Sequence, residues 1–134
     1  MRKIFLDANI LIDLITGRNA NNSGVEEVFK SKAYKQIYIS PLSVHIAFYV
    51  LKPKRGEEIF DSLSKIIKGI SIIPLSEVIL KKALSVNFKD YEDLLQYFSA
   101  IENCDVILTN DVKDFEKIKK LSPSRIEIIS SFKG

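Results

Sequence analysis

KDYEDLLQYFSAIENCDVILTNDVKDF, residues 89–115, joins a helical segment to a short strand and carries seven acidic residues. Apolar residues recur at helical spacing over 91–103, and the run 106–109 that follows is apolar and rich in β-branched residues. A second helical pattern starts soon afterwards, over 112–119. A helix that leads into a short buried strand and then into another helix is typical of a parallel sheet covered by helices.

The same alternation of short β-branched runs and longer helical patterns extends over the rest of the chain, without an internal repeat or a long linker. It predicts one domain, residues 1–134, folded as a three-layer α/β/α sandwich around a mostly parallel five-stranded sheet. The expected strands are 3–6, 36–39, 71–73, 106–109 and 125–129, and the expected helices are 10–15, 25–31, 42–51, 57–67, 77–86, 91–103 and 112–119.

The composition is that of a globular protein of the cytoplasm. Of the 134 residues, 46% are hydrophobic and 28% are charged, which suffices for a core without disulfide bonds. Cys104 is the single cysteine, so an internal disulfide is excluded and a reducing compartment is favoured. No apolar run approaches the roughly 18 residues that a membrane helix needs. Arg2 and Lys3 lead straight into the first strand and not into a signal peptide.

Opposite charges are concentrated in different parts of the chain, although the net charge is only +3. Residues 28–56 contain six basic residues and no acid, whereas residues 87–116 contain eight acids and two lysines. One interpretation is that the two kinds of charge solvate different faces. The other is an acidic pocket with a basic rim, which is the arrangement that a metal-dependent enzyme acting on a polyanion needs.

Acidic residues stand where the expected strands end. Asp7 follows the first strand, Asp111 follows the fourth, and Asp93 lies in the first turn of the helix before the fourth strand. Taken singly, each can be explained as a helix cap or as a first-turn acid that the helix dipole favours. Ends of parallel strands share one edge of the sheet, so these carboxylates are expected to converge and to repel one another unless a cation neutralises them. Carboxylates without a cluster of Cys or His select Mg²⁺ or Mn²⁺, and hydrolysis of a phosphodiester is the natural use of such a site.

Three stretches in order along the chain carry a resemblance to a known family: FLDANILIDL at 5–14, YISPLSVHIAFYVL at 38–51 and DYEDLLQYFSAIENCDVILTNDVKDF at 90–115. Together they resemble the PIN domain, in particular the small VapC-type toxins. The resemblance implies an endoribonuclease that depends on Mg²⁺ or Mn²⁺ and acts as the toxin of a toxin–antitoxin pair. Its expected partners are RNA, a small antitoxin protein that covers the acidic pocket, and a second copy of the chain in a homodimer.

The resemblance also assigns roles to individual residues. Asp90 and Glu92 lie beside the matched acids and are interpreted as cap or rim residues, and Asp13 as the polar side of the first helix. The implied catalytic and metal-binding residues are Asp7, Asp93 and Asp111, with Asp114 as a further metal ligand and with Asn9 and Thr109 as the polar residues that orient the cluster.

One position departs from the family pattern. A Glu is usual on the helix after the second strand, but that register falls here on Ile46, beside His45, and no acid occurs from residue 28 to residue 56. A lone His on an apolar helix is more often a packed residue than a metal ligand. The missing carboxylate leaves a second interpretation open, namely a PIN-like module that binds RNA or protein with weakened or lost catalysis.

Basic residues follow the same apolar helix. Lys52, Lys54 and Arg55 flank a proline at its expected end, where cations also suit the helix dipole. We consider them candidate contacts to the RNA backbone.

Overall fold

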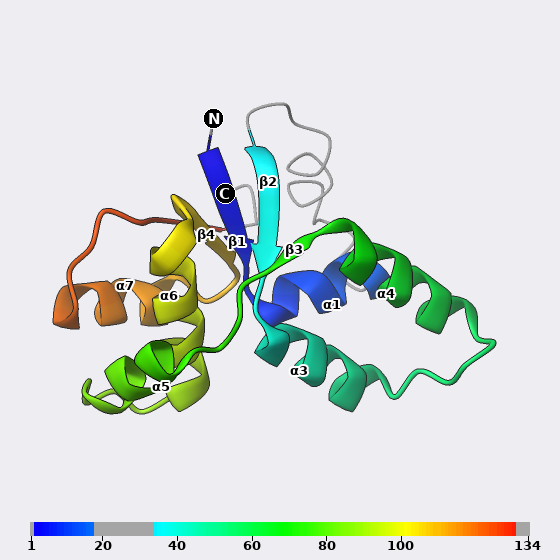
Figure 1. Ribbon diagram of the computed structural model, residues 1–134, viewed down its shortest axis with the longest axis horizontal. Helices are drawn as coiled ribbons and strands as arrows, with labels where there is room; N and C mark the ends of the chain where they lie inside the picture. Colours follow the sequence, from blue (N-terminus) through cyan, green and yellow to red (C-terminus); the bar gives the residue numbers. More distant parts are fainter. Residues whose placement is uncertain (1, 18–33, 131–134) are drawn as a thin grey trace.

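A single parallel sheet forms the centre of the computed structural model, which describes residues 2–17 and 34–130 (Figure 1). Its strands lie in the order β3-β2-β1-β4-β5, and every neighbouring pair is parallel. The predicted five-stranded sheet is therefore confirmed. The strands are β1 (Arg2–Leu6), β2 (Tyr34–Ile39), β3 (Ser71–Ile72), β4 (Val106–Thr109) and β5 (Glu127–Ser130).

Helices cover both faces of this sheet, three on each side in the described part of the chain (Figure 1). One layer consists of α1 (Ala8–Thr16), α3 (Pro41–Leu51) and α4 (Glu58–Gly69). The other consists of α5 (Glu77–Leu84), α6 (Tyr91–Asn103) and α7 (Val112–Leu121). This arrangement is the three-layer sandwich that the alternating sequence pattern predicts.

One hydrophobic cluster lies between the sheet and each of its two helix layers, because successive strand residues point to opposite faces. On β1, Ile4 and Leu6 are fully buried beneath α1 and α3, whereas Phe5 is fully buried against α6 and α7. On β4, Leu108 joins the first cluster and Ile107 the second. The two central strands are thus buried on both sides, and their carboxyl ends are held in fixed positions.

The two edge strands, β3 and β5, differ from their predicted limits for local reasons. β3 has only two residues, since Pro74 interrupts the chain just after Ile73, whose amide still donates to Ile39 O at 2.9 Å. β5 begins at Glu127 and not at residue 125, because the hydroxyl of Tyr97 holds the preceding turn through Ser122 O and Ser124 Oγ. The predicted helix 25–31 lies outside the described residues. No helix in residues 2–17 and 34–130 has the length and apolar character needed to cross a membrane.

Candidate metal centre

The site begins at the carboxyl end of β1 with Asp7, the residue that caps α1. Its Oδ1 accepts a hydrogen bond from the amide of Ala8 at 2.9 Å, and its own amide donates to Leu108 O on the neighbouring strand at 3.0 Å. Asp7 is only 6% exposed. The cap therefore fixes a buried carboxylate at the edge of the sheet. Asp7 thus serves as a helix cap and is also one of the carboxylates at this edge.

Thr109, the last residue of β4, connects Asp7 to the next acid along the sheet. Its hydroxyl donates to Asp7 Oδ2 at 2.9 Å and accepts from the amide of Asp111, also at 2.9 Å. Because Leu6 pairs with Leu108 in the parallel register, the residues after these two strands lie side by side. One buried hydroxyl thereby connects the side chain of Asp7 to the backbone of Asp111.

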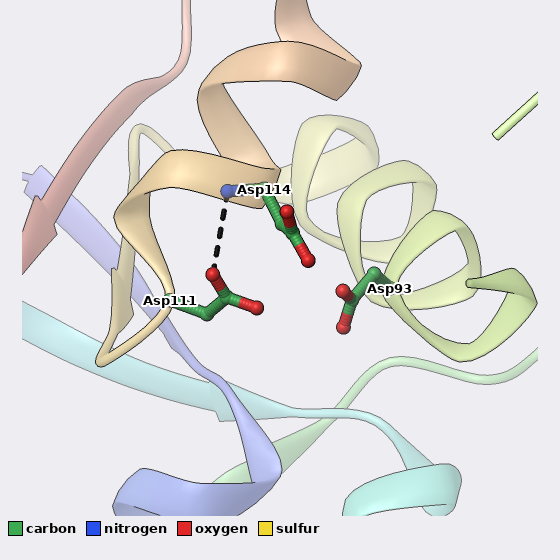
Figure 2. A group of neighbouring side chains, drawn as sticks. All are labelled: Asp93, Asp111 and Asp114. Carbon is green, nitrogen blue, oxygen red and sulfur yellow. Dashed lines mark hydrogen bonds between the residues drawn. The ribbon is translucent and has the colours of Figure 1, made fainter. Parts of the chain in front are cut away.

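Three further carboxylates converge where α6 and α7 begin. Asp93, Asp111 and Asp114, which we call the acidic triad, each offer an oxygen within 4.8 Å of the others (Figure 2). Asp111 caps α7, and its Oδ1 accepts from the amide of Asp114 at 3.3 Å. Asp93 lies in the first turn of α6, whose cap Asp90 accepts from the amide of Asp93 at 3.2 Å. The two helix starts thus direct all three side chains toward one point.

Burial, together with the proximity of these acids, raises the pKa values of Asp7, Asp93 and Asp111. Burial, followed by the charges of Asp90, Asp7, Asp111 and Asp114, raises the pKa of Asp93 from 3.8 to about 7. Burial also raises the pKa of Asp7 and of Asp111 above the ordinary value. Negative charge at this point is therefore costly in the protein alone, and a cation would relieve it. An all-oxygen donor set of three carboxylates fits a hard divalent ion such as Mg²⁺ or Mn²⁺ and could hold one.

Comparison with known proteins places the chain in a family. The family model for the PIN domain matches residues 3–113. This chain is a member of the PIN-domain family. The Aquifex aeolicus protein named Ribonuclease VapC1 is 30% identical to it, over 81% of each chain.

Solved structures share the fold of this PIN domain. A DNA-bound VapBC complex from Salmonella typhimurium contains a chain of TM-score 0.72 and 18% identity, with 98% of this chain and 99% of that chain covered. VapC20 of Mycobacterium tuberculosis, described as a toxin that cleaves the sarcin–ricin loop, gives a TM-score of 0.68 at 12% identity, with 87% and 95% covered. The resemblance drawn from three sequence stretches is thereby confirmed.

The structure brings together most, but not all, of the residues that the PIN motifs single out. Asp7 lies next to the acidic triad without belonging to the group within 4.8 Å; its charge contributes to the raised pKa of Asp93, and the charge of Asp111 contributes to its own raised pKa. Asn9 is exposed on α1, and its side chain makes no hydrogen bond to any residue within 2–17 and 34–130. An orienting role for Asn9 therefore stays a prediction.

The position of the missing Glu carries no substitute ligand. Ile46 is partly buried and packs against the apolar cluster that contains Ile4, Leu6 and Ala47. His45 lies on the exposed side of α3 and is not part of the acidic triad. The cation site, as far as the described residues define it, is therefore built from α6 and α7 and receives no ligand from α3.

The basic residues after α3 lie at the end of that helix opposite to the sheet edge. Ser40 caps α3 beside the site, and Lys52 stands at the other end of this helix of 11 residues, whose length corresponds to about 16 Å. Arg55 places its guanidinium over the ring of Phe60, 5.2 Å from the centroid. Contacts between these cations and RNA stay a prediction, and any such contact lies far from the acidic triad.

Buried polar residues that the sequence analysis did not assign also support the site. Gln96, 2% exposed and one helical turn after Asp93, accepts from Ser40 Oγ at 2.6 Å and donates to Ser43 Oγ at 2.7 Å. Its side chain also lowers the pKa of Asp7 by hydrogen bonding, against the larger effect of burial. Gln96 thus ties α6 to the start of α3 and to the end of β1. The sequence does contain a signal for this role of Gln96. It is a polar residue inside the apolar run LLQYFSA, three residues after the candidate ligand Asp93.

Asp13 corrects one interpretation made from the sequence. It does not lie on the polar side of α1 but is 2% exposed, and its Oδ2 accepts from Asn110 Nδ2 at 3.0 Å. The partner residue stands between Thr109 and Asp111, so this hydrogen bond anchors the same loop from the α1 side. Helical spacing alone could not reveal this, because the partner is 97 residues away in the sequence.

Replacement of Thr109 by Val should lower the free energy of unfolding by about 1–3 kcal/mol, because Asp7 Oδ2 and the amide of Asp111 both lose a buried hydrogen-bond partner. Thr109→Ser keeps the hydroxyl and should retain more of the stability. Urea unfolding of the three proteins measures the difference. A Val variant as stable as wild type would mean that the hydroxyl does not contribute, and a Ser variant no more stable than the Val variant would mean that the methyl group matters as much.

Proposed function

We propose that this protein is a metal-dependent endoribonuclease, the toxin of a type II toxin–antitoxin pair. The observation that carries the proposal is the acidic triad, three carboxylates with mutually accessible oxygens at the sheet edge of a PIN domain. The relative at 30% identity is named a ribonuclease, and it matches 81% of the chain. Acidic side chains at this position are of use to RNA hydrolysis only if a cation joins them, since phosphate and carboxylate repel each other.

The proposed cofactor is Mg²⁺ or Mn²⁺, held by Asp93, Asp111 and Asp114. A divalent cation at such a site lowers the pKa of water and neutralises charge on a phosphoryl oxygen. The protein keeps the three carboxylates converged through the caps of α6 and α7. Asp7 completes the proposed catalytic set with Asp93 and Asp111, but its two oxygens already accept hydrogen bonds from Ala8 and Thr109. Each carboxylate oxygen keeps a further lone pair, so we propose that Asp7 orients the loop that bears Asp111 and also serves the cation as a fourth carboxylate.

The proposed protein partners follow from the same family membership. One structure of similar fold is described as a toxin–antitoxin complex from Klebsiella pneumoniae and another as VapBC2 of Rickettsia felis bound to promoter DNA, and we propose that a small antitoxin covers the acidic triad. A short reading frame directly upstream of the gene would support that pairing. We also propose a homodimer, because α3 exposes Tyr49 at 71% and Val50 at 49%. Light scattering of the purified chain gives the mass that decides between one copy and two.

A second function is favoured by one observation, the apolar packing of Ile46 where the family usually has a Glu. A site with three carboxylates and no ligand from α3 could hold a cation too loosely for turnover. The protein would then be an RNA- or protein-binding module of low activity. Metal-dependent cleavage separates the two functions, since the module binds RNA but does not cut it.

The test of the proposed function is cleavage of a pool of structured RNAs with Mn²⁺ or Mg²⁺. We expect cut products with either ion and none in the presence of EDTA. The purified metal-free protein should regain activity when Mn²⁺ is added back. Intact RNA under all these conditions, despite measurable RNA binding, would contradict the nuclease and support the module.

A further inference from the structure

One basic side chain, that of Lys89, lies directly at the acidic triad. The ammonium of Lys89 lies 3.5 Å from Asp114 Oδ1. Among residues 2–17 and 34–130, no other basic side chain forms an ion pair with a triad carboxylate at 4.0 Å or less. Lys89 also lowers the pKa of Asp111 against the effect of burial. The lysine therefore affects two of the three acids.

The backbone of Lys89 is held by its neighbours, whereas its side chain is mostly exposed to solvent. Phe88 packs against the hydrophobic cluster of α5, α6 and α7, and Asp90 forms the cap of α6, so Lys89 is held between two anchored neighbours. Its own side chain is 69% exposed, whereas Asp114 is 15% exposed. An ion pair with one partner this exposed contributes little to stability, because solvent screens it. The ion pair therefore holds the ammonium of Lys89 on Asp114 only weakly.

Divalent metal and substrate change the balance of charge around this ammonium. A cation held by the triad repels the lysine from Asp114, while the RNA brings a phosphate that attracts it. Phosphate contacts by lysine are the common way in which proteins position a nucleic-acid backbone. Lys52, Lys54 and Arg55 follow the end of α3, about 16 Å along the helix from its start at the sheet edge, and none of them forms an ion pair with the triad in the described part of the chain.

We propose that Lys89 binds a phosphate of the RNA next to the scissile bond and so draws the backbone onto the acidic triad. The proposal rests on the proposed nuclease function and adds a positioning residue to it. In the protein without metal, the same side chain pairs with Asp114 and partly screens the triad. Lys89 thus exchanges one anionic partner for another when metal and RNA bind.

The test compares Lys89→Ala and Lys89→Arg with a matched control, Lys81→Ala. Lys81 is also an exposed, ion-paired lysine, 72% exposed and 2.8 Å from Glu77, but its partner lies outside the triad. Binding of an RNA hairpin is measured with Ca²⁺ in place of Mn²⁺, at several salt concentrations, and the RNA is checked for intactness afterwards. Mn²⁺ affinity and cleavage rates are measured on the same proteins.

Lys89→Ala should weaken RNA binding about 3- to 10-fold and reduce the slope of log affinity against log salt by about one. Its Mn²⁺ affinity should be unchanged or tighter, because a like charge leaves the site. Lys89→Arg should restore most of the binding. If Lys89→Ala binds RNA as Lys81→Ala does, or if its loss of cleavage follows from weaker Mn²⁺ binding, the proposal is wrong. A wild-type protein that fails to cleave would contradict only the nuclease, since the RNA-binding measurement still decides the role of Lys89.

Discussion

Asp93→Asn should abolish metal-dependent RNA cleavage and weaken Mn²⁺ binding by more than the roughly 10- to 100-fold that loss of an outer-shell partner costs. Asp93 is the member of the acidic triad supplied by α6, whereas Asp111 and Asp114 both come from the start of α7. Without it, two carboxylates from one helix turn remain on one side of the proposed cation. The measurement is calorimetric titration with Mn²⁺ together with cleavage of the RNA pool.

Glu92→Gln is the matched control for this substitution. Glu92 precedes Asp93 in the same first turn of α6, but it is exposed and does not belong to the triad. The control removes the same unit of charge from the same helix start, so it should leave Mn²⁺ binding and cleavage close to wild type. Equal activity in Asp93→Asn and wild type would show that the site is wrongly assigned or that a contaminating nuclease does the cutting.

The sequence predicts the architecture well because the strongest local signals agree with the tertiary fold. The α6 and β4 segments have their predicted limits, since Asp90 begins the helix and the run 106–109 is apolar throughout. The limits of β3 and β5 were less predictable. β5 starts late because Tyr97, on α6, holds the turn before it, and no local pattern in the turn itself encodes that contact.

The candidate site was predictable where topology alone decides it. Acids after neighbouring parallel strands must share an edge, and this reasoning places Asp7 beside the loop of Asp111. It could not tell which carboxylates come within bonding distance of one cation. The structure groups Asp93 with Asp111 and Asp114 and leaves Asp7 bound to Ala8 and Thr109, a distinction that depends on side-chain directions.

The supporting polar residues were hidden for a different reason. Gln96, Ser40 and Ser43 lie on helices or helix starts that are otherwise apolar, and each has a partner more than 50 residues away in the sequence. A buried polar side chain needs such partners, but the sequence does not say which ones it finds. Asp13 belongs to the same class, and its burial was missed because its partner Asn110 comes from the loop after β4.

The affinity for Mn²⁺ should rise about tenfold per pH unit below pH 7 and level off above it, so that binding at pH 5 is about 100-fold weaker than at pH 8. The reason is that a cation must displace the proton of Asp93, whose pKa is raised to about 7. Calorimetric titrations with Mn²⁺ from pH 5 to pH 8 measure this dependence. Glu92→Gln should follow the same curve, and an affinity independent of pH over this range would contradict the raised pKa.

The same proton fixes the sign of a stability change in the metal-free protein. The folded protein holds the proton of Asp93 up to about pH 7, whereas the unfolded chain releases it near the ordinary value of 3.8. The unfolded state therefore binds fewer protons between these values, and this carboxyl makes the free energy of unfolding fall as the pH rises from about 4 to 7.

With EDTA present, Asp93→Asn should lack that decrease and be more stable than wild type at pH 8, although it is the variant that cannot cleave RNA. Mn²⁺ well above the dissociation constant of the wild type should reverse the order, because it binds the wild type more tightly than Asp93→Asn and so stabilises it more. Urea unfolding of both proteins at pH 5 and pH 8, with and without the ion, measures these stabilities. A wild type that is more stable than Asp93→Asn in EDTA at pH 8 would show that the triad is not under electrostatic strain.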